Sequence, residues 1–258
     1  MATTAAPPAS PARAGISETE WEARLELASC YRVFDHLGWT ELIYNHITLR
    51  VPGEDQAFLI NPFGLHFSEV TASNLVKIDI DGNKLDDSPY PVNVAGFVQH
   101  STFHRHLPGA HCIMHTHSTA GSAVASLEEG LSLSNFYAGQ LAGKIAYHDF
   151  EGVTVRGEEG GRLLANLGDK RLMILRNHGL LAMGRTVPEA FLRLWVLQRA
   201  CEIQVAAASM GPLRTIPTDV LAVHQRDIGK IAPDYVMGTA EFAALVRLVD
   251  RRDPSWRS

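Results

Sequence analysis

Two short apolar runs of the chain each end in histidine. The segment AHCIMHTH (110–117) alternates in the manner of a half-buried strand and ends with His115 and His117, whereas RLMILRNHG (171–179) is a compact apolar run that closes on His178. The second pattern predicts an interior strand whose end opens into a loop. Since open sheets gather ligands where their strands end, these histidines are the first candidates for a functional site.

His115 and His117 are two residues apart in a predicted strand. Side chains at positions i and i+2 leave the same face of a strand about 6.6 to 7 Å apart at Cα, so both imidazoles can reach one point. A third imidazole from a neighbouring strand end, for which His178 is the best-placed residue, would complete three ligands of a divalent metal and leave positions open for water or substrate. Two histidines at this spacing also occur on ordinary hydrogen-bonded strand faces, and that interpretation stays open.

Helical and strand patterns alternate along the rest of the chain. Capping-box spacing marks two helix starts, Ser17 with Glu20 and Thr186 with Glu189. Apolar periodicity predicts helices over 18–37, 95–106, after 118, over 186–211 and near 240–251, and strands over 47–51, 57–60 and 75–83. The first strands flank a Pro-Gly turn, which favours an early antiparallel sheet. The Gly-rich run 156–162 lacks the spacing of a phosphate loop and is interpreted as a turn.

Length and composition favour one large domain. With 258 residues and 46% hydrophobic content the chain can bury one sizeable core. Residues 1–15 are rich in alanine and proline and are predicted to be a disordered tail. We expect the domain over 16–235, followed by a C-terminal helix and tail over 236–258.

Charge and cysteine content exclude several classes of protein. The 28 acidic and 23 basic residues are interspersed, with a net charge of -5, so no basic stripe predicts a nucleic-acid partner. No signal-peptide core and no apolar window of about 18 residues is present, which predicts a cytoplasmic protein without a membrane span. The chain has an odd number of cysteines, Cys30, Cys112 and Cys201, and each lies in an apolar stretch of sequence. This pattern predicts reduced, buried thiols.

The motif MHTHS, followed about 60 residues later by RNHGLLAMG, resembles the class II aldolase and adducin head family. The resemblance covers residues 20–235 and is greatest to the adducin-like members, in the phrases AGFVQHSTFHRHLPGAHCIMHTHS and AYHDFEG. It implies an α/β fold of three layers, α/β/α, around a central mixed, largely antiparallel sheet, and a homotetramer. It also implies that His115, His117 and His178 bind Zn²⁺ or another divalent metal such as Fe²⁺.

The chain departs from the sugar-phosphate aldolases of that family at residues that the resemblance would make catalytic. Their acid/base glutamate lies 19 residues before the first ligand histidine, and this chain has Gly96 there. Without that carboxylate and without hydroxyl donors for a phosphate, a standard sugar-phosphate aldolase is disfavoured. The positions of the phosphate-binding hydroxyl residues fall on Val94, Ala95 and Phe63, and Asn45 and Gly64 keep the pattern.

Other groups would then have to supply acid and base, and the candidates are His100, His104 and Tyr137. His100 and His104 are four residues apart on one face of the helix before the ligand strand, which could equally be a packed or solvated face. Tyr137, in SNFYAGQLAG, is equally typical of a core or interface aromatic residue.

Three functions remain open from the sequence. The leading hypothesis is a metal-dependent aldolase or lyase-like enzyme that acts on a small hydroxy-carbonyl substrate other than a sugar phosphate. The first alternative is a non-haem iron oxygenase or decarboxylase of aromatic acids, because three histidines with open positions also suit iron. The second is a non-catalytic oligomerisation or cytoskeletal-binding module of the adducin-head type.

Overall fold

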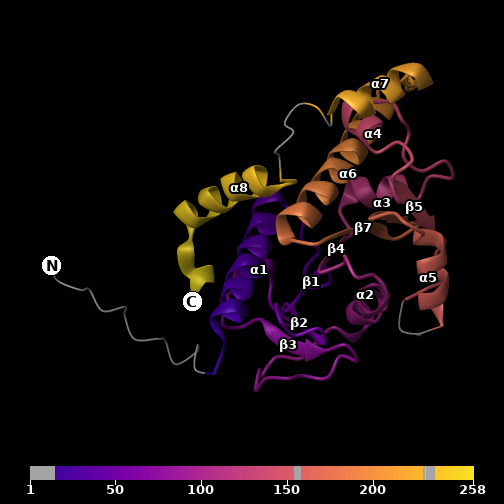
Figure 1. The fold of residues 1–258 in the computed structure, drawn as a ribbon. Coiled ribbons are helices and arrows are strands. Elements are labelled where there is room, and N and C mark those ends of the chain that lie inside the picture. Colours follow the sequence, from indigo (N-terminus) through magenta and orange to yellow (C-terminus); the bar gives the residue numbers. More distant parts are fainter. Residues whose placement is uncertain (1–14, 154–157, 229, 231–235) are drawn as a thin grey trace.

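A mixed sheet of seven strands, in the order β3-β2-β1-β4-β7-β6-β5, runs through the molecule (Figure 1). The computed structural model describes residues 15–153, 158–228, 230 and 236–258. Every neighbouring pair of strands is antiparallel except β5 and β6, which are parallel. The predicted fold class, α/β with a central mixed and largely antiparallel sheet, is therefore confirmed.

The strands are β1 (His46–Arg50), β2 (Ala57–Ile60), β3 (Val76–Asp79), β4 (Cys112–Thr116), β5 (Ile145–His148), β6 (Leu172–Leu175) and β7 (Gly179–Gly184). The helices are α1 (Glu18–Leu37), α2 (Val94–His106), α3 (Thr119–Ala125), α4 (Phe136–Gln140), α5 (Glu159–Leu167), α6 (Val187–Ala208), α7 (Thr218–Ile228) and α8 (Thr239–Arg252), with short 3₁₀ turns at η2 (Phe67–Glu69) and η3 (Pro254–Arg257). No helix in this described part of the chain combines the length and apolarity of a membrane span.

Helices cover both faces of the sheet. Successive side chains of a strand point to opposite faces, so Cys112 and Met114 of β4 join the core beneath α1 and α6, and Ile113 joins the core beneath α2 and α5. His115 continues the series on the α2 side. The alternation therefore decides which helix layer surrounds the candidate histidine.

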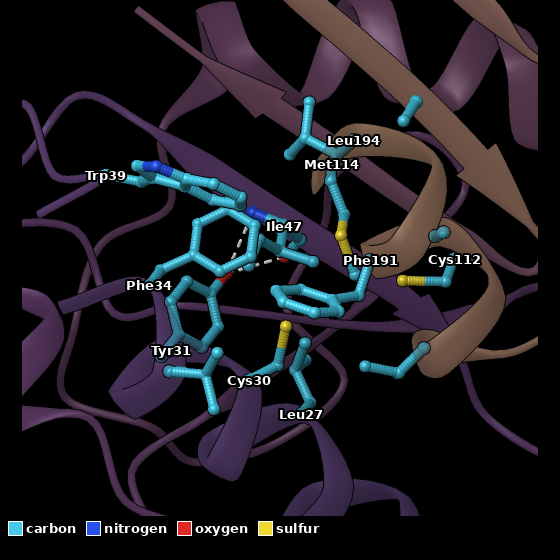
Figure 2. Close-up of a cluster of buried hydrophobic side chains, with 14 of the residues drawn as sticks. Leu27, Cys30, Tyr31, Phe34, Trp39, Ile47, Cys112, Met114, Phe191 and Leu194 are labelled. Atoms are coloured by element: carbon cyan, nitrogen blue, oxygen red, sulfur yellow. Dashed lines mark hydrogen bonds between the residues drawn. The ribbon is translucent and has the colours of Figure 1, made fainter. Parts of the chain in front are cut away.

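The larger core packs α1 and α6 against the middle of the sheet (Figure 2). Phe34 of α1 contacts Phe191 of α6, with ring centroids 6.3 Å apart. The hydroxyl of Tyr31 donates to the Ile47 carbonyl oxygen at 2.6 Å and accepts from the Ile47 backbone nitrogen at 2.9 Å, which anchors β1 to α1. The three cysteines, Cys30, Cys112 and Cys201, are free and buried, as the sequence predicts.

Local signals explain where the long helices begin. Ser17 caps α1 and Thr186 caps α6, each by accepting a hydrogen bond from the backbone nitrogen three residues on.

The predicted turn over 156–162 is wrong from Glu159 onward, because Leu163 and Leu167 bury one face of α5 in the core. The remainder of that segment, and residues 1–14 of the predicted tail, lie outside the described residues.

Two further segments differ from what periodicity alone suggests. The apolar run after His178 forms a strand of the sheet, β7, which lies between β4 and β6 and is joined to β6 by a short turn in which Asn177 has a φ of 56°. The C-terminal segment packs on α1, where Arg32 pairs with Asp253 at 2.8 Å and Trp256 is buried. The first feature adds a strand to the central sheet, and the second brings the C-terminal segment onto α1.

Candidate metal centre

The three histidines of the two motifs lie together at one end of the central strands. His115 is in β4, His117 follows the end of that strand, and His178 is in the turn between β6 and β7, beside them because β4 pairs with β7. Their Nε2 atoms form a tight triangle, with 2.7 Å between His115 and His117, 3.3 Å between His115 and His178, and 2.9 Å between His117 and His178. The structure thus brings together the trio that the sequence singles out.

Hydrogen bonds hold each member of the trio. The Nδ1 of His115 lies 3.0 Å from the Leu180 carbonyl oxygen, which can only accept, so Nδ1 carries the hydrogen and Nε2 presents a lone pair to the other rings. The backbone nitrogen of His117 donates to Asn45 Oδ1 at 3.0 Å, and Ser122 Oγ donates to the His178 carbonyl at 2.9 Å. These bonds hold the His115 ring and the backbone at His117 and His178.

The surroundings keep these imidazoles neutral. Burial lowers the pKa of His178 to about 4, with a further contribution from the neighbouring His117. Burial also lowers the pKa of His117, and it depresses the pKa of His115 still more strongly, with the other two rings adding to the effect. Neutral imidazole is the form that coordinates a metal ion.

The trio fits a divalent cation. Zinc with bonds of about 2.1 Å in tetrahedral geometry separates its ligand nitrogens by roughly 3.4 Å, so the three sides of the triangle need to lengthen by only about 0.1 to 0.7 Å. Several lone pairs facing one another without a cation repel, whereas a cation among them is stabilised. Three protein ligands also leave coordination positions free, as in catalytic sites.

A cavity of about 880 Å³ opens beside the trio. Apart from the histidines, Glu41 is the one charged side chain among the described residues that line it, and no described lysine or arginine does so. Phe63, at one position where a phosphate-binding residue would be expected, lines the cavity with an aromatic ring, and Phe150 is a second aromatic residue of its wall. The described lining therefore lacks the cationic side chains that typically hold a phosphate, and its hydroxyl groups are those of Tyr44, Thr119 and Ser122.

His46 occupies the space above Gly96. An ideal Cβ built on Gly96 would lie 2.6 Å from Cε1 and Nδ1 of His46 and 2.8 Å from its Nε2. His46 is also the direct partner of His115 in the pairing of β1 with β4, and their ring centroids are 5.4 Å apart. The His46 imidazole thus fills the space where a side chain at position 96 would lie. The sequence did not single out His46, because only the strand register places it beside His115.

Two polar side chains of the cavity wall have buried nitrogen atoms without a hydrogen-bond partner. They are His46, through Nε2, and Gln99, through its side-chain nitrogen, and both line the cavity beside the trio. Burial lowers the pKa of His46 to about 4, despite the opposing effect of a hydrogen bond from its ring to the Tyr44 carbonyl oxygen. Since buried polar atoms are nearly always paired, these two mark where a ligand could bind.

His100 and His104 lie behind this wall. Thr48 Oγ1 bridges the two rings, 2.8 Å from His100 Nδ1 and 2.7 Å from His104 Nε2. His104 Nδ1 donates to the Ala110 carbonyl at 2.7 Å, so Thr48 donates to His104 and accepts from His100. Burial lowers the pKa of His104 to about 3. His104 lines a different cavity, of about 1000 Å³, at the other end of β1. His100 is not among the residues that line the trio's cavity, and its ring centroid lies 4.3 Å from that of His46, which does line it.

Tyr137 lies apart from the trio. It sits on α4 with its ring against Trp195 of α6, at a centroid distance of 5.4 Å. It is not among the residues that line the cavity of the three histidines. Of the three acid/base candidates from the sequence, His100 is therefore the one nearest to the cavity.

Comparisons with known proteins agree with this fold. The model of the class II aldolase and adducin N-terminal domain family matches residues 25–205. The crystal structure of an aldolase II superfamily protein from Pseudomonas syringae is 41% identical and superposes with a TM-score of 0.88, covering 95% of this chain and 99% of that one. An L-fuculose 1-phosphate aldolase from Glaciozyma antarctica is 27% identical, with a TM-score of 0.81 and coverage of 98% and 97%.

The similarity extends to a longer protein. α-Adducin of Rattus norvegicus is 43% identical over 241 residues, which are 88% of this chain and 33% of α-adducin. The region that the family model matches, residues 25–205, includes the strands and turns that carry the three histidines. The chain belongs to the class II aldolase and adducin N-terminal domain family.

Proposed function

We propose that the chain is a metal-dependent lyase of the aldolase type, with Zn²⁺ held by His115, His117 and His178, that acts on a small hydroxy-carbonyl compound without a phosphate group. The observation that carries the proposal is the triangle of three neutral Nε2 atoms on the wall of an 880 Å³ cavity. A divalent metal bound there would polarise a carbonyl group and stabilise the negative charge that develops beside it.

The protein's own residues support this chemistry by positioning. The His115 ring donates to the Leu180 carbonyl oxygen, and the backbones of His117 and His178 are held by hydrogen bonds with Asn45 and Ser122. In an aldol cleavage the hydroxyl β to the carbonyl loses its proton as the carbon–carbon bond breaks, an aldehyde leaves, and the α carbon of the other product gains a proton. Buried polar groups at the cavity wall are available to bind that hydroxyl.

The substrate class follows from the lining of the cavity. A phosphate carries nearly two negative charges and is normally bound by arginine, lysine, hydroxyl groups or a helix N-terminus. The described lining has hydroxyl groups on Tyr44, Thr119 and Ser122, but it has no lysine or arginine. It includes the carboxylate of Glu41, which would repel a phosphate, and the aromatic rings of Phe63 and Phe150. An uncharged hydroxy-carbonyl compound with an apolar side suits these walls better than a sugar phosphate does.

The similarity to α-adducin favours one alternative, a binding module in which the trio has no catalytic role. The cavity beside the three histidines favours an enzyme instead, because three protein ligands leave the metal open to a substrate, whereas a purely structural metal site is normally closed by four protein ligands. By analogy with the family resemblance we also propose a homotetramer, which light scattering of the purified protein would test.

An assay of aldehyde release tests the proposal. Protein purified without chelator is incubated with a panel of hydroxy-carbonyl compounds, each with and without a phosphate group. We expect turnover of unphosphorylated members, loss of turnover on chelation and recovery with zinc. Iron as the bound metal, with oxygen consumption, would instead support the oxygenase, and the absence of both metal and turnover would support the binding module.

A further inference from the structure

We propose that His46 and Gln99 form a binding site for an uncharged hydroxyl group of the substrate, beside the three histidines. The inference rests on the proposed function, because it takes the cavity next to the trio as the substrate site. Neither residue belongs to the trio, and His46 lies on β1 whereas Gln99 lies on α2.

Burial without a partner is the first observation. His46 is 4% exposed and Gln99 is 3% exposed, and the Nε2 atom of each has no hydrogen-bond partner in the described protein. Both residues line the same cavity as the trio. A polar atom that leaves water without gaining a hydrogen bond is unfavourable, so a group from outside the chain is the natural partner.

The two atoms require opposite hydrogen-bonding roles. Nδ1 of His46 lies 3.4 Å from the Tyr44 carbonyl oxygen, which can only accept, so Nδ1 carries the hydrogen and Nε2 is an acceptor. The side-chain nitrogen of Gln99 can only donate. A hydroxyl group both donates and accepts, whereas a carboxylate or a fully ionised phosphate has no hydrogen to donate to His46.

The His46 ring is held in place on several sides. Gly96 lies beneath it, where a Cβ would come within 2.6 Å, and the centroids of the His100 and His115 rings are 4.3 Å and 5.4 Å away. The ring therefore cannot swing aside without displacing its neighbours. A fixed acceptor next to the metal-binding trio loses little entropy when a hydroxyl binds, which favours selectivity.

Two probes that differ in one hydroxyl test the inference. Zinc-loaded protein is titrated by ligand-observed NMR with hydroxyacetone and with methoxyacetone, whose ether oxygen can accept but not donate. We expect wild type to bind hydroxyacetone about 3- to 10-fold more tightly, the range of one net hydrogen bond. His46→Leu should abolish this preference, whereas His46→Gln, of similar size, should retain it through its amide oxygen.

The controls separate this inference from the proposed function. Gln99→Leu should weaken hydroxyacetone binding, and His106→Gln, an exposed residue of the same helix and outside the cavity, should leave it unchanged. Zinc content is measured for every protein and should stay constant. If zinc-loaded wild type binds the two probes equally, or does not bind hydroxyacetone, the inference is overturned and the metal site stands. If wild type holds no zinc, the proposed function itself is overturned.

Discussion

Replacing Gly96 by alanine should destabilise the protein, and replacing His46 by alanine as well should reverse the sign of that effect. The added Cβ would lie 2.6 Å from the His46 ring, about 0.8 Å closer than the 3.4 Å at which ordinary contact begins. Crowding of this kind in a packed interior typically costs about 1–3 kcal/mol. Alanine is favoured over glycine in a helix by up to about 1 kcal/mol, which partly offsets the cost.

We therefore expect Gly96→Ala to lower the free energy of unfolding by about 1–2 kcal/mol in wild type, and to raise it by up to about 1 kcal/mol in the His46→Ala background. Urea unfolding of the four metal-free proteins gives both values and the coupling between the two positions. Metal-free protein is used so that bound metal does not add to the measured stability.

A glycine in open space provides the matched control. Gly161 is the third residue of α5, as Gly96 is of α2, and a Cβ there would meet nothing within 4 Å. Gly161→Ala should raise stability slightly in either background. Additive effects of Gly96→Ala and His46→Ala, within about 0.5 kcal/mol, would refute the conclusion that the His46 ring fills the space above Gly96.

Three further predictions follow from the same geometry. His117→Ala should reduce bound zinc, measured by elemental analysis, to a small fraction of the wild-type stoichiometry, whereas His106→Gln should bind zinc as wild type does. Equal zinc binding by the two variants would show that His117 is not a ligand. Tyr31→Phe should lower the free energy of unfolding by about 1–3 kcal/mol, because the Ile47 backbone loses its buried partners; an unchanged urea midpoint would contradict this. Burial alone raises the pKa of Glu20, but hydrogen bonds from Lys77 and Arg24 lower it, and the net effect is a pKa below the ordinary 4.5. The ionised Glu20 therefore stabilises the folded protein above about pH 4.5, and this contribution is lost as the pH falls through the lowered pKa. The stability of Glu20→Gln should therefore change less than that of wild type on acidification below about pH 4.5, and parallel pH profiles would disprove it.

The parts of the fold that the sequence predicts well are those with strong local signals. The capping side chains of Ser17 and Thr186 mark the starts of α1 and α6, and the alternation in β4 shows which residues share a face with His115. In contrast, the glycines of α5 conceal a helix, because burial of Leu163 outweighs their low helix propensity. The prediction succeeds where local preference and packing agree.

One part of the candidate site could be predicted from the sequence and another part could not. The trio could be predicted because its members stand in two short motifs at strand ends. His46 could not, since its place beside His115 depends on the register between β1 and β4, and its contact with Gly96 depends on how α2 crosses the sheet. The missing carboxylate was visible in the sequence, but the imidazole in its space is a property of the folded chain.

A crystal structure of zinc-soaked protein, with anomalous data collected on both sides of the zinc absorption edge, tests the central claim most directly. The account predicts one strong anomalous peak about 2.0–2.1 Å from the Nε2 atoms of His115, His117 and His178. A well-diffracting zinc-soaked crystal with no peak among these three rings, or with zinc bound to other residues instead, would contradict it.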